Sequence, residues 1–204
     1  MRRAYGFAVS LVFGLSMALP SLGAPEDRRV LFGDTHLHTS WSPDANMMGN
    51  RSADPDTAYR FAKGLPVIHP AHRARVRIET PLDFLAVSDH AEFMGIIPMM
   101  LSGDPRVADS ETARRFRTMA QEGRINEAFR DLLRQVVTGD VDPALVSEPI
   151  QASVWAEIAA AAQRHNAPGE FTTLIAWEWS AMPAMSNLHR IVMIREGAEM
   201  ANQF

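Results

Sequence analysis

The sequence has no cysteine, and this absence removes a whole class of chemistry. Without cysteine the protein forms no disulfide, uses no thiolate nucleophile and holds no metal through sulfur. Any metal site must therefore be built from histidine, aspartate and glutamate. These ligands suit zinc, manganese or iron, and the ligand types alone do not choose among the three metals.

The sequence also lacks an excess of positive charge. Lys and Arg total 20 against 24 Asp and Glu, which gives a formal net charge of −4 at pH 7. A nucleic-acid-binding surface needs a basic patch. The nearest candidate, residues 72–77 (HRARVR), alternates arginine with small or apolar residues, as the solvent-facing side of a strand does. We therefore expect no nucleic-acid partner.

Three common catalytic motifs are absent from the sequence: a glycine-rich phosphate-binding loop, Gly-x-Ser-x-Gly and His-Glu-x-x-His. Their absence argues against a P-loop nucleotide site, a serine-hydrolase elbow and a helical zinc-protease site. Any active site must be assembled from residues in other patterns.

The first 23 residues have the pattern of a secretory signal peptide. Arg2 and Arg3 give a positive start, residues 7–19 are apolar, and small residues precede Ala24. The apolar stretch is shorter than the ~20 residues that a membrane-spanning helix needs. We expect cleavage before Ala24, which leaves a domain over residues 24–204 that is periplasmic or secreted and has no stable membrane anchor.

Apolar periodicity and helix-end signals predict an α/β domain. Strands are expected at the apolar runs, and helices where capping residues precede amphipathic stretches. The order strand, helix, strand, helices, strand, strand favours crossover connections. The expected strands are near 30–33, 82–90, 171–180 and 188–196, the helices near 54–64, 92–101, 110–122, 125–138 and 149–165, and 65–81 is extended or hairpin-like.

Candidate functional residues follow these strands. In α/β folds the active site lies beyond the carboxyl ends of the strands. The first strand leads into Asp34, His36 and His38, the second into Asp89 and His90, and the third carries Glu178, whereas His189 stands at the start of the fourth.

The first of these groups, GDTHLHT, pairs two histidines with an aspartate. Side chains alternate along an extended segment, so Asp34, His36 and His38 are predicted to project to the same side. Both imidazoles would then reach one metal or a close pair of metals. Asp34 could be a ligand itself or could orient a histidine. The His-x-His pattern alone is weak evidence for a metal site. The evidence becomes stronger because polar residues also follow the other predicted strands.

Each of the other candidate residues also has a purely structural interpretation. His90 is interpreted as a metal ligand and Asp89 as a residue that hydrogen-bonds a ligand, or both as a strand-end cap. Glu178, between two tryptophans, would be a carboxylate at the rim of an apolar environment that must be paired or coordinated. A carboxylate bridging two cations satisfies that need, and a salt bridge to Arg190 is the alternative. His189 is a further ligand or an ordinary core or surface histidine.

Four remaining polar residues are assigned structural places. Asp44 is expected in a turn whose loop lies near the metals. His69 and His72 are expected at the surface, and His165 in the last turn of a helix, where a cation favours the helix dipole.

The motifs GDTHLHTSWSPDA, PLDFLAVSDHAEF, AWEWS and NLHRIVMIR, in this order, resemble the PHP (polymerase and histidinol phosphatase) superfamily, and are closest to its exported PHP-like branch. The resemblance covers most of residues 30–195. It implies a distorted seven-stranded β/α barrel with two or three divalent metal ions (Zn, Mn or Fe). By this resemblance the metal ligands are His36, His38, His90, Glu178 and His189, with Glu178 bridging and Asp34 and Asp89 supporting the catalytic centre.

The resemblance implies a metal-dependent hydrolase acting on a small-molecule phosphoester through a metal-activated hydroxide. An amidohydrolase-like activity on C–N bonds is an alternative, because a DxHxH strand end also opens those barrels. A non-catalytic or degenerate metal-binding module is a second alternative. The family pattern continues with a later histidine and an Asp-x-His that this sequence does not reach, so we expect only the N-terminal part of such a barrel, incomplete at the C-terminus.

Overall fold

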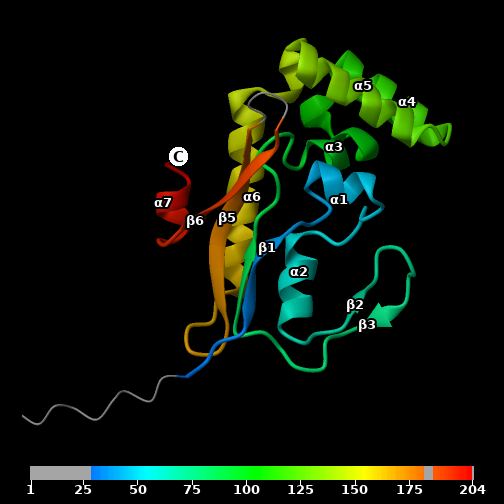
Figure 1. Ribbon diagram of the computed structural model, residues 1–204. Coiled ribbons are helices and arrows are strands. Elements are labelled where there is room, and N and C mark those ends of the chain that lie inside the picture. The colour runs from blue at the N-terminus through cyan, green and yellow to red at the C-terminus, as the bar shows by residue number, and fades with distance from the viewer. Residues whose placement is uncertain (1–28, 182–185, 204) are drawn as a thin grey trace, which may run out of the picture. The chain divides into compact units, whose positions relative to one another are not determined.

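Four strands form one mixed sheet at the centre of the computed structural model, which describes residues 29–181 and 186–203 (Figure 1). From Leu31 onward these residues belong to one compact unit. The sheet has the order β1-β4-β5-β6, and its strands are β1 (Gly33–Leu37), β4 (Phe84–Val87), β5 (Thr172–Ala181) and β6 (Leu188–Ile194). The expected signal peptide lies outside the described residues.

The sheet confirms an α/β fold and corrects one connection. β1, β4 and β5 are parallel, as crossover connections require, but β6 runs antiparallel to β5. Only residues 182–187 join β5 to β6, and a parallel crossover needs about a dozen residues or more. The two strands therefore form a hairpin-like pair, and His189 lies opposite Ser180 of β5.

Two helices cover the sheet. Figure 1 shows α6 (Glu148–His165) lying along the sheet, with α2 (Pro55–Ala62) beside β1. The Asp54 carboxylate caps α2 by accepting a hydrogen bond from the Thr57 amide at 2.8 Å, as the sequence predicts. The apolar residues between these elements form one core, which includes Tyr59, Ala62, Leu85, Val87, Ala159, Ala162, Phe171 and Ile175.

His165 does more than end a helix. Its Nε2 lies 2.8 Å from Oδ1 of Asp56 at the start of α2, and its ring stacks on Tyr59 with 5.4 Å between the centroids. Arg164 reaches the other oxygen of Asp56 at 2.6 Å. These contacts join the end of α6 to the start of α2.

A second, helical core stands beyond the carboxyl ends of the parallel strands. It is built from α3 (Ile96–Ser102), α4 (Glu111–Gln121) and α5 (Ile125–Thr138), with the short 3-10 turns η1 (Pro105–Val107) and η2 (Pro143–Leu145). The predicted bounds of α4 and α5 agree with the structure. The helix predicted from residue 92 begins only at Ile96, because Phe93 and Gly95 have φ values of 56° and 69°, outside the right-handed helical region.

The remaining elements are short. β2 (Val67–Ile68) and β3 (Arg75–Val76) form the hairpin expected in residues 65–81, with Arg75 exposed. His72 is exposed and His69 is half-buried. Two short helices were not predicted: α1 (Pro43–Met47) and α7 (Ala198–Ala201). Among the helices that the structure describes, none has the length and apolar character needed to cross a membrane.

The burial of Leu85 in the sheet leads to a prediction about the free energy of unfolding. Leu85 in β4 is fully buried, whereas Leu133 on α5 is 58% exposed. Leu85→Ala should lower the free energy of unfolding by ~2–5 kcal/mol, because it leaves a cavity among packed side chains. The matched control Leu133→Ala should change it by less than ~0.5 kcal/mol. Urea denaturation of both variants measures the difference, and equal losses would contradict this core.

Candidate metal centre

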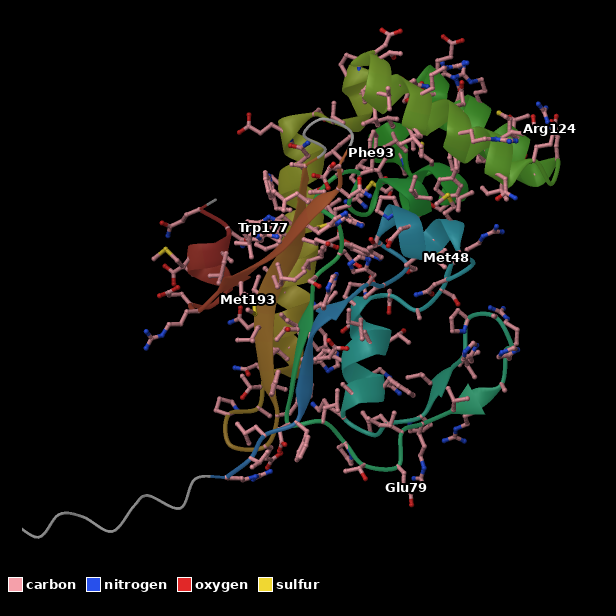
Figure 2. All side chains as sticks on the ribbon, viewed as in Figure 1. Met48, Glu79, Phe93, Arg124, Trp177 and Met193 are labelled. Atoms are coloured by element: carbon pink, nitrogen blue, oxygen red, sulfur yellow. The ribbon has the colours of Figure 1, made fainter. Side chains whose placement is uncertain are left out.

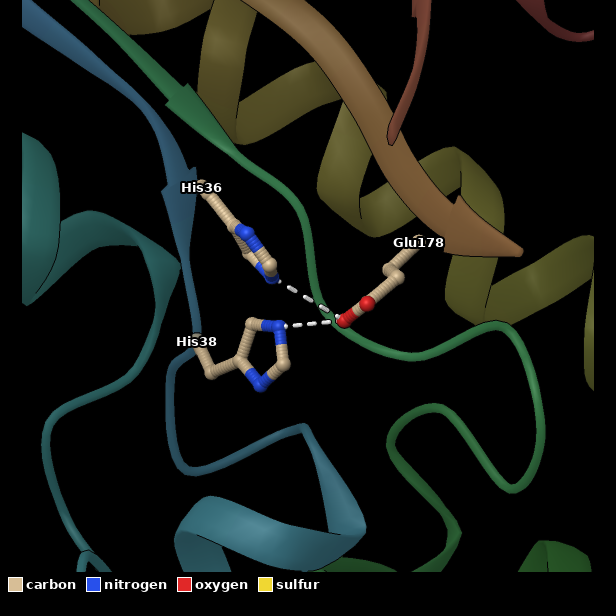
Figure 3. A group of neighbouring side chains, drawn as sticks. All are labelled: His36, His38 and Glu178. Carbon is tan, nitrogen blue, oxygen red and sulfur yellow. Dashed lines mark hydrogen bonds and ion pairs between the residues drawn. The ribbon is translucent and has the colours of Figure 1, made fainter. Parts of the chain in front are cut away.

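One buried carboxylate lies at the meeting point of the predicted site residues. Glu178 in β5 is 1% exposed, and its Oε2 lies 3.2 Å from Nε2 of His36 and 2.7 Å from Nε2 of His38 (Figure 3). The same oxygen lies 3.5 Å from Nδ1 of His90, and Oε1 lies 2.6 Å from Nδ1 of His189. Segments far apart in the sequence therefore bring four imidazoles to one carboxylate.

The alternative partner of Glu178 does not engage it. Arg190 donates a hydrogen bond to the His189 carbonyl at 2.8 Å, and no ion pair joins it to Glu178 among the described residues. The cluster is open on two sides, because the His36 and His189 side chains are 54% and 38% exposed while those of His38 and His90 are about 15% exposed. Solvent reaches the cluster past His36 and His189.

A bulge in β1 aims the first two histidines. Asp34 pairs with Leu85 and Leu37 pairs with Val87, so β1 has one more residue than β4 between these two pairs. The Asp34 carboxylate accepts a hydrogen bond from the His36 amide at 2.9 Å. Strict alternation along β1 is therefore interrupted, and Asp34 contacts the backbone of His36 rather than an imidazole ring. Its predicted part in the chemistry stays a prediction.

Asp89 fixes the segment that leaves β1. This carboxylate is 1% exposed and accepts two hydrogen bonds from Thr39, one from the amide at 2.5 Å and one from the hydroxyl at 2.6 Å. Burial raises the pKa of Asp89 to about 6, although the two hydrogen bonds from Thr39 act to lower it. Asp89 thus ties the chain beside His38 to the end of β4.

Asp44 joins the cluster although the sequence indicated only a turn there. It lies in the first turn of α1, and its Oδ2 is 2.9 Å from Nδ1 of His38 and 3.7 Å from Nε2 of His90. The Ser42 hydroxyl donates to Asp44 at 2.5 Å. Partial burial acts to raise the pKa of Asp44, but the hydrogen bonds from His38 and Ser42 hold it well below its usual range.

Two more polar residues near His90 escaped the sequence analysis. The Ser180 hydroxyl lies 2.9 Å from Nδ1 of His90 and 3.4 Å from Nδ1 of His189. Glu92 accepts a hydrogen bond from the Ser180 amide at 3.4 Å and lies 3.9 Å from His90. Ser180 stands two residues after Glu178 in β5, and this spacing puts both side chains on one face of the strand.

The pKa values in the cluster reflect competition between burial and charge. Burial acts to lower the pKa of His38, but the hydrogen bond and charge of Asp44, with the charge of Glu178, raise it above its ordinary value. For His90 burial wins, and the pKa falls. Burial acts to raise the pKa of Glu178, yet the surrounding histidines, with His90 first, lower it. Glu178 is therefore held as a carboxylate.

A family model, described as "Protein of unknown function (DUF3604)", matches residues 25–204. The chain belongs to the DUF3604 family. The matched region contains every residue of the cluster and begins just after the predicted signal peptide. No curated protein and no solved structure matches the chain.

The side chains of this DUF3604 protein can hold a metal. Three groups of donor atoms lie within 4.8 Å of one another: His36, His38 and Glu178; His38, Asp44 and His90; and His90, Glu178 and His189. Nε2 of His38 is buried and, among the described residues, has no hydrogen-bond partner, although Glu178 Oε2 is only 2.7 Å away. A cation shared by these two atoms would satisfy both.

The Thr39–Asp89 contact makes a second stability prediction. Thr39→Val keeps the shape of the side chain but leaves Asp89 Oδ2 without its donor, so the free energy of unfolding should fall by ~1–3 kcal/mol. The exposed Thr118, whose hydroxyl donates to the Arg114 carbonyl, provides a matched Thr118→Val control with an expected change below ~0.5 kcal/mol. Urea denaturation in EDTA separates this effect from metal binding. A Thr39→Val variant as stable as the wild type would contradict the role of Asp89.

Proposed function

We propose that this DUF3604 protein is an exported, metal-dependent hydrolase of phosphoesters, with the PHP-type fold that its motifs resemble. The observation that carries the proposal is the buried Glu178 carboxylate with imidazole nitrogens on both of its oxygens. A carboxylate in this position costs free energy unless cations or protonated partners compensate it. The signal-like first 23 residues support export to the periplasm or beyond.

The cluster offers donor groups for two cations. One would be held by His36, His38 and Glu178, and the other by His90, Glu178 and His189, so that Glu178 would belong to both groups. The third group, with Asp44, competes with the first for His38. If Nε2 of His38 binds a metal, Nδ1 carries a proton that it donates to Asp44, and this hydrogen bond fixes the ring. Zinc, manganese and iron all accept these donors.

Divalent cations in this cluster would supply an activated water and would stabilise negative charge on the phosphoryl group. The protein's own residues do the positioning. Asp44 orients the His38 ring through Nδ1, and Ser180 orients the His90 ring through Nδ1. Asp34 and Asp89 act at the backbone of His36 and Thr39, so both are positioning residues in this proposal. Substrate reaches the cluster past the exposed His36 and His189 rings.

Metal analysis tests the ligand assignment. His36→Ala and His90→Ala should each lower the bound zinc, manganese or iron of the purified protein by about one equivalent or more, because each removes a donor from a different group. His72→Ala, on the exposed hairpin, is the control and should leave the metal content unchanged. Wild-type metal content in both cluster variants, measured by mass spectrometry, would rule out this site.

Turnover tests the reaction. Hydrolysis of p-nitrophenyl phosphate should require added Mn²⁺ or Zn²⁺ and should fall by more than ~100-fold in Glu178→Gln, because loss of the bridging carboxylate exceeds the 10–100-fold effect of a supporting residue. The exposed Glu170→Gln is the matched control. Metal-dependent cleavage of an anilide with no phosphoester cleavage would favour the amidohydrolase alternative. Bound metal with neither activity would favour a non-catalytic module.

A further inference from the structure

A cavity apart from the metal cluster is lined by residues of α1, α3 and α4. Its volume is about 630 Å³, within the range of small-molecule sites, and its walls include Trp41, Arg51, Pro98, Met99, Arg106 and Arg117. Figure 2 shows the side chains of this region, with Met48 labelled at the end of α1. None of the predicted metal ligands lines this cavity.

The charge of the cavity is unbalanced. Arg106 is neutralised by Asp104 at 2.9 Å and Glu157 at 2.8 Å. Arg51 and Arg117 have no ion-pair partner among the residues that the structure describes. Two guanidinium groups are thus available to one cavity, and a guanidinium fork matches the oxygens of a phosphate, sulfate or carboxylate.

The Arg117 guanidinium lies beside Gly103. Gly103 follows α3 with φ of 74°, and a Cβ at this residue would collide with the Arg117 guanidinium. The left-handed backbone favours glycine at this position, and the Arg117 guanidinium occupies the space beside it. Arg117 lies against the backbone at the end of α3, at the wall of the cavity.

The other wall is apolar. Trp41, Pro98 and Met99 line the cavity, and Trp41 also packs against the helical core. The Trp41 carbonyl accepts a hydrogen bond from the Gly95 amide at 2.8 Å, which fixes the backbone of this wall beside α3. An indole and two apolar side chains favour a ring or hydrocarbon group over water.

Helix α1 separates this cavity from the metal centre. Asp44 in its first turn contacts His38 and His90, whereas Asn46 lines the cavity. Residues two apart in an α-helix point about 200° apart, so the two side chains leave α1 on nearly opposite sides. The cavity is a site of its own.

We propose that this cavity binds a small organic anion, a phosphate or sulfate ester or a phosphonate with an aromatic group. The oxyanion lies between Arg51 and Arg117, and the ring lies against Trp41. This binding rests on residues outside the metal cluster, so it stands or falls independently of the proposed hydrolase activity.

Calorimetric titration of the metal-free protein with phenylphosphonate, which cannot be hydrolysed as an ester, tests the proposal. Arg51→Gln and Arg117→Gln should each raise the dissociation constant about tenfold, because each removes a charge-assisted hydrogen bond. Arg117→Lys should recover part of the loss, since it keeps the charge without the fork. Arg130→Gln, on the exposed surface of α5, is the matched control and should bind as the wild type does.

Two further measurements identify the occupant. Trp41→Leu should weaken the binding of phenylphosphonate and leave the binding of inorganic phosphate unchanged. Equal weakening of both would contradict the proposed contact between the ring of the ligand and Trp41. His36→Ala should leave the affinity unchanged, and a loss there would move the anion to the metal centre and overturn the proposal. Wild-type affinity in both arginine variants would also overturn the proposal. So would the absence of any binding heat at up to about 10 mM phenylphosphonate.

Discussion

The structure depends on the compensation of one buried negative charge. Glu178 is 1% exposed in the third strand of the sheet, and a carboxylate at that depth is stable only with positive or hydrogen-bonding partners. Four imidazoles supply them, from the ends of β1 and β4 and from β6. Because these partners come from three segments, the carboxylate also links β1, β4 and β6 to one another.

The supporting contacts act on the backbone more than on the rings. Asp34 accepts from the amide of His36 at the β1 bulge, and Asp89 accepts twice from Thr39. Both contacts fix the segment that carries His36 and His38, so that two neighbouring imidazoles reach one oxygen. Asp44 and Ser180 act on the rings themselves, through Nδ1 of His38 and of His90. The centre is thereby held by polar contacts before any ion binds.

The short helix α1 lies between two chemically different places. Its first turn presents Asp44 to the histidines, and Asn46 lines a cavity with two guanidinium groups that have no ion-pair partner within residues 29–181 and 186–203. The Asn46 amide donates to the Ser40 carbonyl at 3.1 Å, so the helix is tied to the segment that leaves β1. A ligand in the cavity and a cation in the cluster would both act on this segment, and linkage makes any coupling between them reciprocal.

The sequence by itself determined the donor types, since a chain without cysteine must use His, Asp and Glu, and it determined the helices with clear ends, such as α2 behind Asp54. It also indicated His36, His38, His90 and Glu178, because polar residues gather at strand ends in α/β folds, and it indicated His189 at the start of the fourth strand. Only the tertiary structure decided that Asp44 and Ser180 join them, that a bulge interrupts β1, and that β6 runs antiparallel. These features depend on strand register and on contacts between distant segments, which local patterns do not encode.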